Sequence, residues 1–170
     1  MTLCRWAAAA AFAFASLVAL PACRAEPQAV EAPPHSAARA ATDLDIVPLS
    51  LCGDAGCRNF EVEVARSPDQ QARGLMFRES LGRERGMLFP FPSPRPASFW
   101  MKNTLIPLDM IFIRADGTIA RIAANTVPHS LEPVGVAEPV AAVLEIAGGR
   151  AAQLGIREGD RATWPGGPAR

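Results

Sequence analysis

A short polar run, Lys102-Asn103-Thr104, directly follows the apolar Phe99-Trp100-Met101. An ammonium, an amide and a hydroxyl beside an aromatic wall form the mixture that small-molecule pockets use, a mostly apolar lining with a few convergent polar groups. We therefore expect a ligand pocket beside this motif, with Trp100 in its wall.

Further polar residues lie within apolar segments, among them Arg73, Arg78, Asp109 and Glu145. Burying such a group without a partner costs several kcal/mol, so each must be paired, solvated or facing a ligand. The two arginines would favour an anionic ligand such as a carboxylate or a phosphate. The candidate ligand-binding residues are Arg73, Arg78, Trp100, Lys102, Asn103, Thr104 and Asp109.

A purely structural role for these residues is the alternative. Lys102 could pair with Asp109 or Glu145, while Asn103 and Thr104 tie down the turn before Pro107. The domain would then be a structural or interaction module with no ligand.

An enzyme is a less favoured interpretation, and we assign no catalytic residue. No Ser-His-Asp pattern is visible, and His129 is expected in an exposed loop. Acidic side chains are numerous, but nothing selects one pair for a hydrolase.

Four methionines, Met76, Met87, Met101 and Met110, could supply thioether ligands to Cu(I). Each lies within an apolar run, where filling the core is the ordinary role of methionine. We therefore expect no metal and no cofactor.

The elements that must position these residues are mostly strands. Alternating apolar residues predict a strand around Phe60–Val64, and continuous apolar runs predict buried strands over 108–114 and 140–146. Ser67 and Pro68 start a short helix that Gly74 ends, and a second short helix is expected over 150–154. A proline-rich crossing over 90–97 separates two apolar segments. The fold class predicted is α+β, mostly β, with a small curved sheet or closed barrel of short strands and two short helices.

The net charge of the chain limits the classes of partner that we expect. The chain has 17 Lys+Arg and 17 Asp+Glu in 170 residues, a formal net charge of zero. Nucleic-acid and polybasic membrane binders rely on an excess of positive charge, so we expect no nucleic acid and no direct membrane surface. We expect a monomer.

The N-terminus has the pattern of an export signal. Arg5 precedes a small-apolar run over 7–22, which predicts a signal peptide over residues 1–22. Leu20-Pro21-Ala22-Cys23 resembles a lipobox, so we expect Cys23 to be lipidated; ordinary cleavage near this point is the alternative. Residues 23–43 are rich in Ala and Pro and predict a disordered linker, which leaves a single domain over 44–170. The expected location is the periplasm, on an outer-membrane lipid anchor.

Cys52 and Cys57 flank a Gly-Asp-Ala-Gly turn. In an exported protein this pair predicts a disulfide that closes a hairpin. A redox or metal role is the alternative, although no second ligand pair lies nearby in the sequence.

The motif FWMKNTLIPLDMIFI over 99–113 is specific. The chain also contains five shorter motifs, which are GLMFR, GMLF, DGTIARI, VLEIAGG and GIREGD in chain order. Across about 60–164 this series resembles the domain of unknown function 192 family. The resemblance implies a compact β-rich domain, frequently exported, with no established activity.

Overall fold

The computed structural model describes residues 44–168. The predicted signal peptide, the lipidation site at Cys23 and the linker over 23–43 lie outside these residues. Within the described part, no helix is long and apolar enough to cross a membrane.

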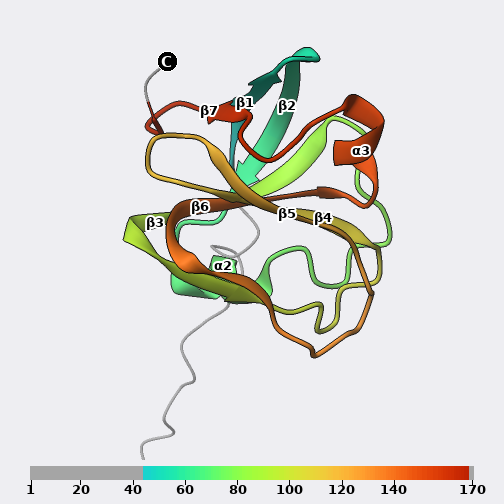
Figure 1. Cartoon of the computed structure of the whole chain (residues 1–170). Helices are drawn as coiled ribbons and strands as arrows, with labels where there is room; N and C mark the ends of the chain where they lie inside the picture. Colours follow the sequence, from blue (N-terminus) through green and yellow to red (C-terminus); the bar gives the residue numbers. More distant parts are fainter. Residues whose placement is uncertain (1–43, 169–170) are drawn as a thin grey trace, which may run out of the picture. The chain divides into compact units, whose positions relative to one another are not determined.

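Seven strands form one curled, mixed sheet in the order β5-β4-β6-β3-β2-β1-β7. Figure 1 shows the sheet curving around itself, with both helices outside its strands. The elements are β1 (Asp45–Gly53), β2 (Gly56–Val64), α2 (Pro68–Arg73), β3 (Arg85–Phe99), β4 (Leu108–Ile113), β5 (Ile119–Thr126), β6 (Val134–Ala147), α3 (Arg150–Leu154) and β7 (Arg161–Thr163). A single bridge between Thr118 and Arg161 joins the two ends of the sheet order. The mostly β prediction with two short helices is confirmed, as a curled half-barrel.

The first hairpin carries the predicted disulfide. Cys52 and Cys57 are directly opposite each other in the β1–β2 register, next to the turn, and their sulfurs are bonded. A pairing this close in sequence fixes the hairpin end and leaves neither thiol free.

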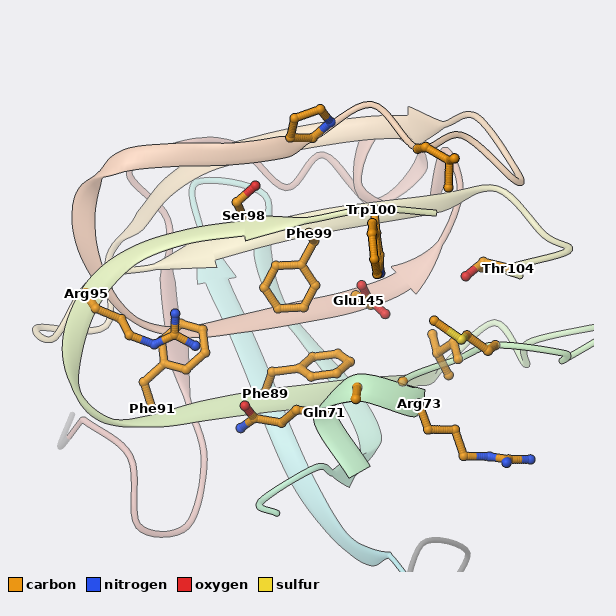
Figure 2. Close-up of a pocket in the computed structure, with 16 residues that line it drawn as sticks. Gln71, Arg73, Phe89, Phe91, Arg95, Ser98, Phe99, Trp100, Thr104 and Glu145 are labelled. Carbon is orange, nitrogen blue, oxygen red and sulfur yellow. The ribbon is translucent and has the colours of Figure 1, made fainter. Parts of the chain in front are cut away.

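The long strand β3 differs most from prediction, because the proline-rich segment expected as a crossing is part of one continuous strand. Four prolines alternate with other residues over 90–96, and the pairing with β6 shifts register between Pro90 and Ala97. The strand bends there into two arms, and both arms pair with β6, which is almost as long. Figure 2 shows the bend beside Phe91 and Arg95.

Strand β4 and the second half of β6, over 140–146, are buried on both faces, as their apolar runs predict. Alternate side chains, such as Ile111 and Leu144, enter the core enclosed by the curled sheet. The others, such as Phe112 and Val143, enter a second core on the opposite face. Glu145 belongs to this second face by the same alternation.

The short helix α2 begins as its sequence predicts. The Ser67 hydroxyl accepts a hydrogen bond from the Gln70 amide, and the Gln70 side chain accepts one from the Ser67 amide. Gly74 ends the helix at φ 48°, a backbone conformation that favours glycine. The side chain of Gln71 donates to the carbonyl oxygens of Ala65 and Pro90, which ties α2 to the first arm of β3.

Candidate functional site

A cavity of about 500 Å³ opens on the second face, between the two arms of β3. Phe89 and Phe91 come from the first arm, and Ser98 and Phe99 come from the second (Figure 2). Helix α2 and the segment after it close one side, and residues of the loops that follow β3 and β5 complete the lining. The bend in β3 therefore creates the cavity.

Four aromatic side chains, Phe89, Phe91, Phe99 and Trp100, line the cavity. The rings of Phe89 and Phe99 meet edge to face with their centres 5.2 Å apart, and Phe99 makes a similar contact with buried Phe112 at 6.5 Å. Trp100 adds a larger ring that is 52 % exposed. The wall offers flat apolar surfaces to a ligand.

One acidic side chain, Glu145 of β6, lies at the base of the cavity. Its cross-strand neighbours are Met87 of β3 and Met110 of β4, and the residue is only 4 % exposed. Figure 2 shows its carboxyl group between Trp100 and Phe89. Burial raises the pKa of Glu145 to about 8, so the carboxyl is mostly protonated at neutral pH.

Two arginines lie at the edge of the cavity, on opposite sides of the view in Figure 2. Arg95 places its guanidinium 4.0 Å from the centre of the Phe91 ring, and Arg73 extends from the last turn of α2. Within residues 44–168, neither guanidinium has an acidic partner. Both are exposed and free to meet an anion.

The predicted polar motif is only partly in the cavity. Trp100 and Thr104 line it, and the Thr104 hydroxyl donates to the Lys102 carbonyl at 3.4 Å. Lys102 is exposed, with its ammonium 5.3 Å from the centre of the Trp100 ring, and it pairs with neither Asp109 nor Glu145.

Asn103 holds the motif in place instead of lining the cavity. It has a φ of 56°, and its amide donates to the Met76 sulfur at 3.9 Å. The Asn103 carbonyl accepts a hydrogen bond from the Phe77 amide, itself at a φ of 64°. His129, at a φ of 61°, donates its amide to the Thr104 carbonyl. Three loops are thus joined by their backbones beside the cavity.

Like Lys102 and Asn103, the predicted residues Arg78 and Asp109 do not line the cavity. Arg78 donates both arms of its guanidinium to Glu63, at 2.6 and 2.5 Å. Asp109 is fully buried, and its carboxylate accepts backbone N–H bonds from Asn125, Gly149 and Ala151, each at 2.8 Å. Asp109 therefore joins β4 to the start of α3 and to the end of β5.

The methionines serve mainly as core. Met87, Met101 and Met110 are buried in the second core, and the Met101 sulfur accepts a hydrogen bond from the Thr126 hydroxyl at 3.1 Å. In the described part of the chain, no three His, Cys, Asp or Glu side chains are grouped as metal ligands would be.

A family model, DUF192 (Uncharacterized ACR, COG1430), matches residues 51–164. The chain belongs to the DUF192 family. No curated protein matches it.

Two crystal structures are similar to this DUF192 chain. One is a protein of unknown function from Novosphingobium aromaticivorans DSM 12444, with 50% sequence identity and a TM-score of 0.71, covering 72% of this chain and 88% of that chain. The other is a "putative transcription regulator" from Sinorhizobium meliloti 1021, with 42% identity and a TM-score of 0.71, covering 73% of this chain and 97% of that chain. The shared fold therefore spans most of both relatives.

Two polar groups of the DUF192 cavity, Gln71 and Arg95, were not considered from the sequence, and Glu145 was singled out as a polar residue in an apolar segment but not placed among the ligand-binding candidates. The isolated acid in VAAVLEIAGG was the available signal for Glu145, because no charge of opposite sign lies within that run. The sequence did not indicate that Arg95 lines the cavity, because its position there depends on the bend in β3, which the proline pattern does not predict.

Proposed function

We propose that this DUF192 domain binds a small anionic ligand in the cavity between the arms of β3. The observation that carries the proposal is an aromatic-walled cavity of about 500 Å³ with Arg73 and Arg95 at its edge, neither paired with an acid in the described residues. Cavities of roughly 300–1,000 Å³ with apolar walls and a few polar groups are typical ligand sites.

The ligand needs an apolar body and an acidic group. Phe89, Phe99 and Trp100 would cover the body, while a carboxylate or phosphate would reach one of the two guanidiniums. Guanidinium groups bind such oxyanions with two parallel hydrogen bonds. Thr104 adds a hydroxyl to the same lining.

A nucleic-acid ligand has less support, although one relative is named as a regulator of transcription. The formal net charge is zero, and α2 and α3 have only six and five residues, too short for a recognition helix in a major groove. The structural or interaction module remains the alternative, and it predicts no affinity for small ligands.

Binding can be followed through the fluorescence of Trp100 after Trp6 and Trp164 are replaced by Phe. We expect hexanoate and hexyl phosphate to alter the signal with at least about tenfold higher affinity than hexanol. Arg73→Gln or Arg95→Gln should reduce this advantage, whereas Arg58→Gln, on the distant disulfide hairpin, should retain it. Equal binding of hexanol, or equal loss in the Arg58 control, would contradict the proposal.

The natural ligand can be sought by native mass spectrometry of the protein purified from its own cells. A co-purified acid of low mass, lost in the Arg73→Gln/Arg95→Gln double variant, would support the proposal.

We also propose that the domain acts in the periplasm as a monomer on a lipid anchor at Cys23. The apolar run over 7–22 and a disulfide between Cys52 and Cys57 support export, because disulfides persist in oxidising compartments. Cys23→Ala should move the protein from the membrane fraction to the soluble periplasmic fraction. An unchanged membrane fraction would contradict lipidation at this residue.

A further inference from the structure

Glu145 has no part in the anion recognition proposed above, yet it is the most deeply placed polar group of the cavity. It is 4 % exposed, and no residue in 44–168 forms a hydrogen bond or an ion pair with its carboxyl. Every fully enclosed side-chain nitrogen or oxygen of the described part does have a partner. The Glu145 oxygens must therefore reach open space, and the space beside them is the cavity.

The other buried acid of this sheet, Asp109, has a structural role, and its hydrogen bonds can be compared with the surroundings of Glu145. Asp109, on the neighbouring strand β4, accepts three backbone N–H bonds at 2.8 Å. Glu145 has Met87 and Met110 as cross-strand neighbours, and these thioether side chains donate no hydrogen bond. An unpaired buried carboxyl is unfavourable, so its place at the base of a cavity points to a partner brought by a ligand.

The surroundings favour a cationic partner. An ammonium group has three donors and can engage both carboxyl oxygens, whereas a hydroxyl has one. The faces of aromatic rings also attract cations, and two rings of this cavity already do so at its edge, Phe91 with Arg95 and Trp100 with Lys102.

We infer that Glu145 binds an ammonium group of the ligand, so that the ligand is zwitterionic, with its anionic group at the arginine edge and its ammonium at the base. This inference rests on the proposed function for the anionic half. The chemical class is a small amino acid or an aminoalkyl phosphate with an apolar body.

Binding such a ligand would release a proton. Burial raises the pKa of Glu145 to about 8, so at pH 7 the empty site holds a carboxylic acid. The arriving ammonium donates to the carboxylate oxygen, and the carboxyl proton passes to the buffer. The charged groups that line the same cavity are Arg73 from α2 and Arg95 from β3, while β4 contributes the neutral Met110 behind Glu145.

Four probes with the same six-carbon body separate the two halves of the site: hexanol, hexanoate, hexylammonium and 6-aminohexanoate. Isothermal titration calorimetry in two buffers of different ionisation enthalpy measures both affinity and proton release. We expect 6-aminohexanoate to bind at least about tenfold more tightly than hexanoate. We also expect release of nearly one proton at pH 7 and an affinity that rises about tenfold per pH unit from pH 6 toward 8.

In Glu145→Gln, the ratio of the 6-aminohexanoate affinity to the hexanoate affinity should fall to about one, and proton release should disappear. Glu132→Gln removes an exposed acid from the loop after β5 and should retain both effects. An unfolding curve for each variant confirms that it is folded.

The outcomes distinguish this inference from the proposed function. Tighter binding of hexanoate than of hexanol, with no gain from the amino group, overturns the ammonium inference and leaves the anion site standing. Binding of hexylammonium with proton release, without binding of hexanoate, supports Glu145 as the ammonium site and contradicts the anion site. Equal loss of the amino-group advantage in Glu132→Gln also overturns the inference.

Discussion

Glu145→Gln should make the domain markedly more stable than the wild type above neutral pH. Burial raises the pKa of this carboxyl from 4.5 to about 8, so the folded state holds a proton that the unfolded state releases. The unfolded chain therefore binds fewer protons between these two values, and the free energy of unfolding falls as pH rises. Glutamine has nearly the same shape and no charge, so it removes this dependence.

The magnitude follows from the two pKa values. A shift from 4.5 to about 8 corresponds to roughly 5 kcal/mol, at about 1.4 kcal/mol per pH unit. This contribution is fully present below pH 4.5 and is lost progressively up to pH 8. At pH 7 the loss is already about 3 kcal/mol, a large share of the ~5–15 kcal/mol that stabilises a typical domain.

Urea unfolding followed by circular dichroism at intervals from pH 5 to 9 measures the effect. The midpoint of the wild type should fall steadily relative to that of Glu145→Gln across this range. Glu138→Gln is the matched control, because Glu138 is exposed and its hydrogen bond with Arg114 lowers its pKa. Parallel pH profiles for the wild type and Glu145→Gln would refute the reasoning, since they would mean that Glu145 is ionised in the folded state at little cost.

Three further predictions concern stability. Asp109→Ala leaves three backbone N–H groups without their acceptor, that of Ala151 being buried, and should lower the free energy of unfolding by about 2 kcal/mol or more; a loss below 1 kcal/mol in urea unfolding would show that other acceptors replace it. Reduction of the Cys52–Cys57 disulfide should cost about 2 kcal/mol, the value for a six-residue loop, and the Cys52→Ser/Cys57→Ser variant should be insensitive to reductant. Gly135→Ala should destabilise by about 2 kcal/mol or more, because its Cβ would collide with the Ala97 carbonyl across the β3–β6 ladder; an unchanged thermal midpoint would contradict that register.

The sequence predicts best those features of the fold that depend on residues close together in the chain. The start of α2 at Ser67 and Pro68, its end at Gly74 and the Cys52–Cys57 hairpin all depend on residues a few positions apart. Burial of β4 on both faces is visible as a continuous apolar run. Such local patterns suffice for the fold class.

The site was less predictable because contacts between distant segments assemble it. The motif that begins at Trp100 indicated the region, and Trp100 and Thr104 do line the cavity. The partners of Asp109 lie as far away as Ala151, so the sequence could not show that backbone amides satisfy this acid. Glu145 is visible in the sequence as an isolated acid, but its lack of a partner becomes evident only when the sheet places methionines on both sides of it.

The alternating prolines of β3 have a consequence for self-association. β2 pairs with β3 only as far as Leu88, so the strand continues beyond it with one edge uncovered. The Leu88 and Pro90 carbonyls face this side, where Ala65 and Gln71 donate to them, but a proline has no amide hydrogen to offer in return. Four prolines within 90–96 thus deny an approaching strand the donors it would need, so the segment that bends to open the cavity is also a poor template for pairing with a second chain.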